Sequence, residues 1–411
     1  MWKMLLVKKD IVAKAMPDLK IFTDNIEQTA LDQINTLLAQ KPFSDCKVRI
    51  MPDVHAGAGC VIGFTADLGN KVIPNIVGVD IGCGMRVVSL GKTEIDFEKL
   101  DRLIRRKIPS GRDVHEAPVR PFDPEQLFCC AGLKNHARFA DSVGTLGGGN
   151  HFIEIDKDEE GNKYLVIHTG SRNLGKQVAD HYQKLAIETI KGGMADKKRA
   201  REALIEQYKA AGQERKIAGA LRELEKVRRP SANIPDELCY LEGTDRENYL
   251  HDMKVCQEFA VLNRETIAEI LLEGMGWEPS GTFESIHNYI DHQNNIVRKG
   301  AIAAYRGQKV LIPLNMRDGC ILGVGKGNED WNCSAPHGAG RVLSRSKAKE
   351  TISMEAYKAS MNGIFTTSVN PDTLDESPMA YKPSEEIIRL VRDTVEIEKI
   401  IKPVYNFKAA E

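Results

Sequence analysis

Strand-like and helical segments follow one another along this chain in no regular order, and this feature most constrains the fold. Strand-like runs bounded by Gly, Asp or Asn occur at 46–50, 72–79, 85–90, 152–155 and 164–167. Helical periodicity of apolar residues occurs at 28–40, 94–107, 174–191, 246–273, 346–361 and 384–401. Because βαβ units would alternate strictly, the order predicts an α+β fold with mixed β-sheets and surrounding helices.

One segment, 195–230, differs in composition from the rest. It carries eleven basic and six acidic residues, whereas the whole chain of 411 residues has a formal net charge of −1. The pattern predicts two charged helices that break near Gly212 and end at Pro230. A solvated helical face is the favoured interpretation, and an arm that contacts phosphates is the alternative. We expect one domain over 1–411 with a charged helical insertion at about 195–230.

The bulk composition indicates a cytoplasmic protein of enzyme size. No apolar run approaches the length of roughly 18 residues that spans a bilayer, which predicts no membrane partner. The first ten residues hold too short an apolar run for a signal peptide. Nine scattered cysteines are typical of reduced thiols. We expect a monomer in which any polyanion contacts a local basic patch.

Asp80 and Cys83 stand three residues apart between glycines, in the segment VDIGCGM that follows the apolar run 72–79. Glycine-rich backbone at the end of a strand can hold two side chains rigidly. A hard carboxylate oxygen and a soft sulfur together suit a borderline divalent metal. For an isolated D-x-x-C, however, a buried structural cysteine beside a turn aspartate would be the favoured interpretation.

Four of the ten histidines lie at strand ends or in short polar and glycine-rich motifs: His151, His168, His287 and His337. Each alone would more often be a satisfied polar residue than a ligand. Their coincidence with the D-x-x-C motif instead predicts a site for Zn²⁺, Mn²⁺, Fe²⁺ or Co²⁺, among which the residue types do not choose.

Groups suited to phosphate accompany these histidines. Arg172 and Arg341 follow His-containing motifs rich in glycine, and arginine makes bidentate phosphate contacts. Asn150 can donate to a phosphate oxygen, and Glu154 can accept hydrogen bonds from a base edge. The combination favours phosphoryl or nucleotidyl transfer over peptide hydrolysis. The sequence has no H-E-x-x-H and no P-loop motif, so a nucleotide must be held in another way.

Six motifs in a consistent order resemble the RtcB family of RNA ligases, over about residue 45 to the C-terminus. They are Met51–His55 (MPDVH), Val79–Met85 (VDIGCGM), Gly149–Glu154 (GNHFIE), His168–Arg172 (HTGSR), His287–Tyr289 (HNY) and His337–Val342 (HGAGRV). The resemblance implies an RtcB-like fold with a central metal-containing cleft and a single catalytic domain.

This resemblance also implies an activity, that of a 3′-phosphate/5′-hydroxy nucleic acid ligase dependent on GTP and Mn²⁺. Such an enzyme joins RNA ending in a 3′-phosphate or 2′,3′-cyclic phosphate to RNA with a 5′-hydroxyl, through a GMP-histidine intermediate and an RNA-3′-pp-G end. RNA repair, of tRNA or rRNA, or tRNA splicing would be its use. The alternatives are a Mn²⁺-dependent cyclic phosphodiesterase or phosphatase that does not ligate, and a non-catalytic RNA-binding protein.

The matched motifs assign roles to individual residues by resemblance. Two Mn²⁺ ions would be bound, with Cys83 bridging, by Asp80, Cys83, His151, His168 and His287. His337 would be the nucleophile that accepts GMP, and Asp53 would orient it. Contacts to the guanylate or the RNA ends are implied for Asn150, Glu154, Arg172, Asn315, Gly338, Ala339, Gly340, Arg341, Tyr381 and Lys408.

Two features depart from the family pattern. The segment Pro313–Met316 reads PLNM where the family often has Pro-Gly-Ser-Met, so Asn315 would replace a serine contact to the nucleotide. The chain is also shorter than archaeal members and is similar to a divergent bacterial branch. Its RNA can therefore differ from tRNA exons. The sequence leaves open which RNA is joined and whether a helper protein takes part.

Overall fold

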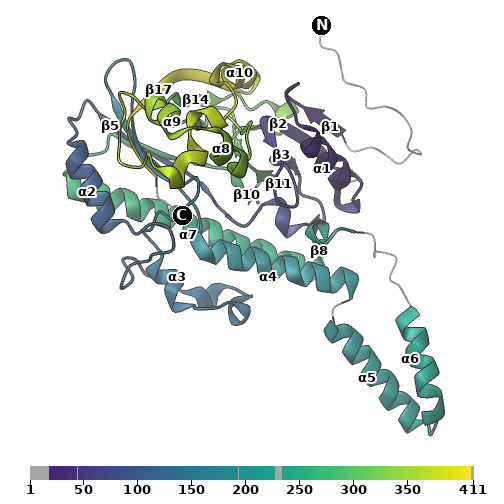
Figure 1. The fold of residues 1–411 in the computed structure, drawn as a ribbon. Helices are drawn as coiled ribbons and strands as arrows, with labels where there is room; N and C mark the ends of the chain where they lie inside the picture. Colours follow the sequence, from purple (N-terminus) through teal and green to yellow (C-terminus); the bar gives the residue numbers. More distant parts are fainter. Residues whose placement is uncertain (1–17, 44, 193, 227–233, 409–411) are drawn as a thin grey trace.

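The structure is a computed structural model that describes residues 18–43, 45–192, 194–226 and 234–408. Two large mixed sheets form the upper part of the body, and long helices run beneath them (Figure 1). The larger sheet has the order β13 (Lys309–Asn315), β14 (Gly319–Gly325), β17 (Val395–Lys408), β6 (Phe152–Lys157), β7 (Lys163–Thr169), β5 (Gly84–Gly91) and β9 (Gly281–Ile286), with β16 (Phe365–Thr366) paired to β17.

The second sheet lies beside the first. Its order is β1 (Asp18–Ile21), β2 (Lys47–His55), β3 (Ile62–Asp67), β11 (Ile296–Lys299) and β10 (Asn288–Asp291). Two short pairs complete the strands of the described residues: β12 (Ala301–Ala303) with β15 (Ser334–Pro336), and β4 (Lys71–Val72) with β8 (Leu241–Glu242). Parallel pairing of β1 with β2 and of β16 with β17 makes both large sheets mixed, as predicted.

The helices of the described residues cover these sheets and extend from them. They are α1 (Gln28–Leu38), α2 (Phe97–Lys107), α3 (Ala137–Asp141), α4 (Arg172–Lys191), α5 (Met194–Ala210), α6 (Ile217–Lys226), α7 (Gly243–Met275), α8 (Arg345–Thr351), α9 (Met354–Ser360) and α10 (Ser384–Leu390). The predicted helices at 28–40, 94–107, 174–191 and 246–273 are confirmed as α1, α2, α4 and α7. The α+β fold class is therefore confirmed.

Alternation along the strands β6 and β7 separates the core from the site. Ile153, Ile155 and Ile167 are fully buried on the face that packs against α2 and α7. Glu154 and His168 point to the opposite face and line a cavity. Because successive side chains of a strand point to opposite faces, the sheet anchors the apolar core on one side and positions polar groups on the other.

The segments 384–401 and 346–361 differ from their predicted single helices. Helix α10 ends at Leu390, and strand β17 begins at Val395, because Val395 and Ile397 alternate with the exposed Glu396 and pair with β14. Residues 346–361 form two helices, since the Ser353 side chain caps a new helix by accepting from the Ala356 amide.

The apolar run 72–79 is also not the predicted strand. Only Val72 lies in a strand, and Pro74 opens a short 3₁₀ turn because its fixed φ suits the first position of a helix. Ile73, Ile76 and Val77 are nevertheless buried in the core. The β-branched residues of this run are therefore used for packing in the core and do not form a β-strand.

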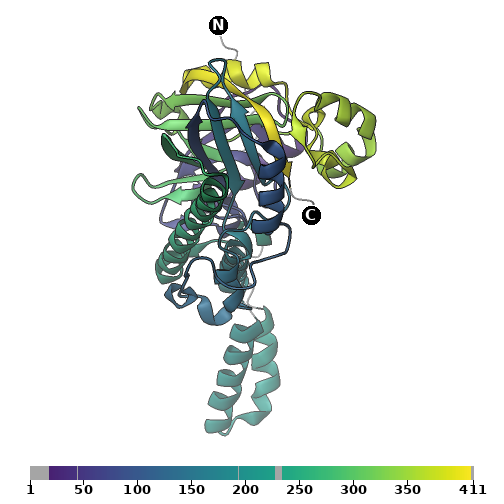
Figure 2. The same cartoon turned by 90° about the vertical axis from the view of Figure 1, so that its left-hand side faces the viewer.

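The charged segment 195–230 contributes the helices α5 and α6, which lie side by side and extend away from the sheets (Figures 1 and 2). The chain turns between them at Gly212, whose φ is +64°, in agreement with the predicted break. The predicted end at Pro230 lies outside the described residues. That this pair is an insertion in a single catalytic domain stays a prediction. Among the helices that the structure describes, none is long and apolar enough to cross a membrane.

Candidate metal centre and nucleotide pocket

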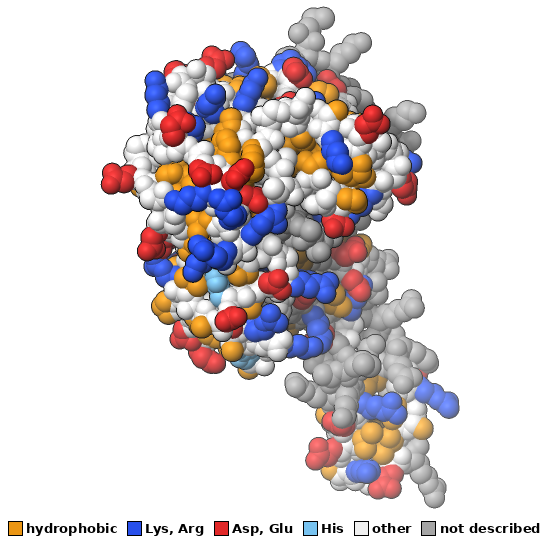
Figure 3. Space-filling view, turned by 60° about the vertical axis from the view of Figure 1, so that its left-hand side comes forward, with side chains coloured by type: hydrophobic (Ala, Val, Ile, Leu, Met, Phe, Trp, Pro, Cys, Tyr) orange, Lys and Arg blue, Asp and Glu red, His pale blue; other side chains and the backbone are white. Residues whose placement is uncertain are grey.

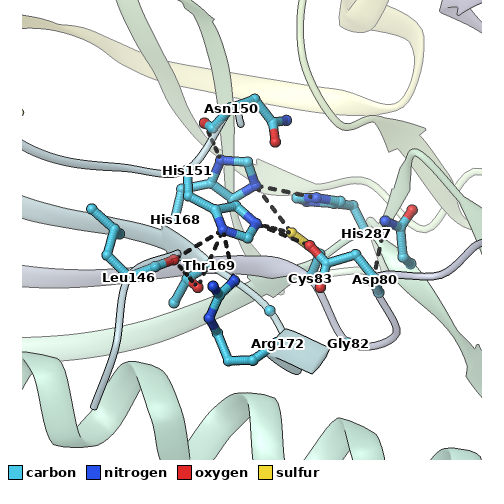
Figure 4. A network of polar contacts seen from close by, with 12 residues as sticks. Asp80, Gly82, Cys83, Leu146, Asn150, His151, His168, Thr169, Arg172 and His287 are labelled. Atoms are coloured by element: carbon cyan, nitrogen blue, oxygen red, sulfur yellow. Dashed lines mark hydrogen bonds and ion pairs between the residues drawn. The ribbon is translucent and has the colours of Figure 1, made fainter. Parts of the chain in front are cut away.

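The five side chains predicted to bind metal converge around one sulfur atom (Figure 4). Cys83 Sγ lies 3.3 Å from His168 Nε2 and 3.6 Å from His151 Nε2. His151 Nε2 lies 2.9 Å from an Asp80 carboxylate oxygen, and His168 Nε2 lies 3.4 Å from His287 Nε2. The donor atoms form two groups, Asp80–Cys83–His151 and Cys83–His168–His287, and Cys83 belongs to both.

The sheet register brings these ligands together from distant parts of the chain. In the register, Met85 on β5 and Phe152 on β6 both pair with His168 on β7. Arg264, fully buried on α7, donates to the carbonyls of Gly82 and Thr169, at 2.8 and 2.7 Å, and so fixes the two ligand loops. These contacts preorganise the cluster before any ion binds.

The hydrogen bonds of the imidazole rings show that the cluster fits a cation. His151 Nδ1 lies 3.0 Å from the Leu146 carbonyl, and His168 Nδ1 lies 3.2 Å from the Asn150 carbonyl. A carbonyl only accepts, so each Nδ1 carries the proton and each Nε2 presents its lone pair to the cluster. Lone pairs that face a carboxylate and a sulfur repel one another unless a cation lies between them. The imidazole, thiol and carboxylate donors suit a borderline divalent metal.

Burial sets the protonation states of these ligands. It lowers the pKa of His168 and of His287 well below the usual value, so both rings are neutral at pH 7 and could act as ligands. Burial and the nearby Asp80 carboxylate raise the pKa of the Cys83 thiol well above its usual value. A metal ion at this sulfur would therefore displace a proton.

His337 lies beside this cluster, directly after β15, and Asp53 holds its ring from β2. The fully buried Asp53 accepts hydrogen bonds from His337 Nδ1 at 2.6 Å and from the His337 amide at 3.1 Å. The Nε2 atom is thereby left with its lone pair. A Cβ on Gly340, whose φ is +74°, would lie 2.4 Å from the Asp53 carbonyl oxygen, so the close approach of these two segments requires glycine.

A cavity of about 500 Å³ opens beside His337 and collects most of the predicted nucleotide contacts. Its lining includes His337 together with Asn150, Glu154, Asn315, Gly338, Ala339, Gly340, Arg341, Tyr381 and Lys408. The structure therefore brings nine of the ten predicted contacts together around one hollow, although they come from five separate stretches of sequence.

Comparisons with known proteins show the family of the chain. The family profile described as "tRNA-splicing ligase RtcB" matches residues 33–127 and 130–409. The chain belongs to the RtcB family. It is 30% identical to the RNA-splicing ligase RtcB of Escherichia coli K12, in an alignment that covers 93% of this chain and 95% of that protein. It is 26% identical to the tRNA-splicing ligase RtcB of Aeropyrum pernix, covering 83% of each chain.

A buried acid that sequence reasoning missed organises the pocket of this RtcB-family chain. Glu376 receives hydrogen bonds from Arg341 Nη1 at 3.2 Å, the Tyr381 hydroxyl at 2.7 Å and Lys408 Nζ at 2.6 Å. Burial alone would raise the pKa of Glu376, but the charges of Lys408 and Arg341 lower it to about 2. No local motif marks this residue, because its partners come from other segments.

A second missed acid lies behind Glu154. Asp156 is fully buried on the same face of β6, within 4.8 Å of Glu154 and the Cys320 thiol. Burial and the neighbouring Glu154 raise the pKa of Asp156 well above its usual value, and burial raises that of Glu154. The Asn406 amide donates to Glu154 at 2.5 Å and fixes the carboxyl at the cavity. Because side chains two residues apart on a strand point to the same face, the spacing of Glu154 and Asp156 on β6 could have revealed that the two acids are neighbours.

Asn315 lines the cavity, but its side chain is engaged in a turn of the RtcB-family chain. Its amide nitrogen donates to Asp318 at 2.8 Å, and its oxygen accepts from the amides of Arg317 and Asp318 at 3.0 and 2.9 Å. These bonds restrain the amide group that is predicted to contact the nucleotide. Its nucleotide contact stays a prediction.

Arg172 is the predicted contact that does not line the cavity. Its guanidinium lies 3.4 Å from His151 Nδ1 (Figure 4). It also donates to the Gly111 carbonyl at 3.2 Å. Its φ is +56°, an unfavourable conformation for a residue with a side chain, and a Cβ on Gly147 would overlap the guanidinium. The guanidinium of Arg172 therefore lies against the Asp80–Cys83–His151 group. Its contact to the guanylate or the RNA ends stays a prediction.

Proposed function

We propose that this chain is an RNA ligase that joins a 3′-phosphate or 2′,3′-cyclic phosphate end to a 5′-hydroxyl end, using GTP and two Mn²⁺ ions. The observation that carries the proposal is the Asp53–His337 pair at the border between the Cys83 cluster and the nucleotide-sized cavity. A hydrolase of RNA ends would need the metal cluster but not an oriented histidine beside it. RNA as substrate follows from the names of the RtcB relatives.

The first step uses the free Nε2 atom of His337. Asp53 holds the proton on Nδ1, so Nε2 attacks the α-phosphorus of GTP and the bond from that phosphorus to the bridging oxygen breaks. Pyrophosphate leaves, and GMP stays on the ring. The Asp53 carboxylate stabilises the positive charge that develops on the imidazole, as an orienting carboxylate does in other histidine-dependent enzymes.

The remaining steps transfer GMP to RNA and release it. A cyclic phosphate end is first opened by water to a 3′-phosphate. An oxygen of this 3′-phosphate then attacks the GMP phosphorus, the P–N bond to His337 breaks, and the RNA ends in a phosphoanhydride. Finally the oxygen of the 5′-hydroxyl attacks the 3′-phosphate, its proton passes to solvent water, and the phosphoanhydride bond breaks so that GMP leaves.

The five cluster side chains would hold the two Mn²⁺ ions. When bound there, the ions would supply positive charge to the reacting phosphates. Of the chain's own groups, Arg341 and Lys408 line the cavity as cations, and Glu376 fixes both in place. Glu154 offers a carboxyl to a base edge at the cavity wall, held there by Asn406.

The RNA strand would approach along a second hollow. A cavity of about 680 Å³ is lined by Arg105, Arg112 and Lys408, and Lys408 lines the nucleotide cavity as well. Lys and Arg side chains lie across the middle of the face in Figure 3, with Asp and Glu side chains beside them. Local positive charge of this kind lets a chain with a net charge of −1 bind a phosphate backbone.

Incubation with α-labelled GTP and Mn²⁺ tests the proposal. The wild type should acquire a label that is labile in acid and stable in alkali, as a phosphoramidate is, and His337→Ala should acquire none. His292→Ala, which changes a histidine outside the site, should label as the wild type does. An unlabelled wild type that opens cyclic phosphate ends without joining RNA would instead establish the phosphodiesterase alternative. Undiminished label on His337→Ala would contradict the proposed nucleophile.

A further inference from the structure

A second cluster of metal-binding side chains lies outside the catalytic site, in the loop before α3. Glu125, Cys130 and His136 place a carboxylate oxygen, a sulfur and an imidazole nitrogen within 4.8 Å of one another. Figure 1 shows α3 beneath α4 and α7, whereas the sheets that carry the Cys83 cluster lie above them. The proposed RNA ligase mechanism uses none of these three residues.

The distances in this cluster match the edges of a tetrahedral zinc site. Cys130 Sγ lies 3.8 Å from Glu125 Oε1 and 3.8 Å from His136 Nδ1. With zinc–sulfur bonds of about 2.3 Å and zinc–nitrogen or zinc–oxygen bonds of about 2.0–2.1 Å, a tetrahedral angle separates the donors by about 3.5 Å. Small side-chain adjustments would therefore seat an ion, and the exposed Glu125 is free to make them.

The imidazole is already oriented as a ligand. His136 Nε2 lies 2.7 Å from the Leu133 carbonyl, so the proton resides on Nε2 and the Nδ1 lone pair faces Cys130. A carbonyl that fixes the distal nitrogen is the usual support of a metal-binding histidine. Asn135 turns the chain back toward Cys130 with a φ of +57°, a conformation that asparagine tolerates better than most residues.

The frame around the cluster is rigid. Asp252 on α7 accepts hydrogen bonds from the backbone amides of Phe128 and Cys129, each at 2.9 Å. The Gln177 side chain on α4 accepts a hydrogen bond from the Lys134 amide at 2.7 Å. Cys130 is buried in the main hydrophobic core. The three donors therefore stand on a loop whose backbone is fixed by two long helices, which lowers the entropic cost of binding an ion.

We propose that Glu125, Cys130 and His136 form a structural zinc site with a water as the fourth ligand. A thiolate and a carboxylate together carry two negative charges, which balance a divalent ion. Sulfur and imidazole ligands select Zn²⁺ or Co²⁺ over Mg²⁺ and Ca²⁺. The ion would hold together the loop 123–136, which leads through α3 to the glycines before His151. The site is independent of the proposed ligase chemistry.

Cobalt spectroscopy in a Cys83→Ala background tests this site, because that change removes the sulfur of the catalytic cluster. Titration of the metal-free protein with Co²⁺ should produce one sulfur-to-cobalt charge-transfer band with a stoichiometry of one ion per chain. The band should disappear when Cys130→Ser is added and persist when Cys333→Ser is added as a matched control. Absence of the band in Cys83→Ala, or its survival in Cys83→Ala/Cys130→Ser, would overturn the proposal.

Thermal unfolding separates loss of zinc from loss of folding. In EDTA, His136→Gln should unfold at the same temperature as the wild type, because His136 is only partly buried. Addition of Zn²⁺ should raise the unfolding temperature of Cys83→Ala and leave that of Cys83→Ala/His136→Gln unchanged. An equal rise in both proteins would contradict the assignment.

Discussion

Lys408 at the end of β17 donates a hydrogen bond of 2.6 Å to Glu376, and both side chains are buried. Two opposite charges withdrawn from water stabilise the fold only while both are present, because removal of one leaves the other uncompensated. The pair also fixes the position of the Lys408 ammonium group at the cavity beside His337. Loss of the Lys408–Glu376 pair should therefore lower both the free energy of unfolding and the affinity for GTP.

Glu376→Gln should lower the free energy of unfolding at pH 7 by on the order of 3 kcal/mol, from the lowering of the Glu376 pKa from 4.5 to about 2. Because the pKa of Glu376 is lower in the folded state, its carboxylate stabilises the fold at pH values above the unfolded pKa of 4.5. This stabilisation is lost as the pH falls through the folded pKa. The difference from the wild type should thus shrink between pH 4.5 and pH 2. Denaturant unfolding at a series of pH values measures it, and a difference independent of pH would contradict the ionised pair.

Asp156→Asn should have the opposite pH dependence. The pKa of Asp156 is raised, so its contribution is fully present below the unfolded value of 3.8 and is lost as the pH rises toward the folded value. Asparagine is a neutral substitute of the same shape. We expect the free energy of unfolding of Asp156→Asn to equal that of the wild type near pH 4. Between pH 4 and pH 8 it should become progressively larger than that of the wild type. Parallel unfolding curves at pH 5 and pH 8 check this, and a relative loss at pH 8 would show that Asp156 is ionised.

Asp53→Asn should reduce the rate of GMP transfer to His337 by about 10²–10⁴-fold. An asparagine amide facing Nδ1 would favour the other tautomer and would not stabilise the charged ring. GTP binding should change little, since Asp53 does not line the cavity. Rapid-quench labelling gives the rate and fluorescence titration gives the affinity. Equal losses in both would indicate a structural defect instead.

Cys83→Ala should abolish both Mn²⁺ loading and the labelled adduct, because its sulfur belongs to both donor groups. His337→Ala should keep Mn²⁺ binding largely intact, as its ring is outside both groups. Metal content by mass spectrometry, after removal of divalent ions and reloading with Mn²⁺, distinguishes the two variants. Normal manganese content in Cys83→Ala would place the ions elsewhere.

Arg112→Ala should weaken RNA binding and reduce the slope of log affinity against log salt by about 1, as expected for the loss of one phosphate contact. GMP transfer to His337 without RNA should be unaffected. Arg306→Ala, at an exposed turn that lines neither cavity, is the matched control. An unchanged slope in Arg112→Ala would place the RNA strand on another face.

From the sequence, the residues of the Cys83 cluster could be proposed more completely than those that organise the cavity beside His337. The five side chains predicted to bind metal stand in four short motifs, with Asp80 and Cys83 together in one of them, so a local reading could propose all five. That they bind metal stays a prediction. Glu376 joins Arg341, Tyr381 and Lys408 only in the folded chain, and its burial is a tertiary property. The helix predicted at 384–401 failed for a related reason, since β17 is stabilised by pairing with β14 and β6 rather than by its own periodicity.

The position of β17 in its sheet also determines when the molecule can be completed. Residues 395–408 insert between β14 and β6, although β6 is made about 240 residues earlier. During synthesis on the ribosome, the edge of β6 that pairs with β17 therefore stays unpaired until β17 has emerged. The cavity gains Lys408 only with the last strand. A nascent chain halted before this strand would present an open edge prone to association with other chains and would lack one wall of the cavity beside His337.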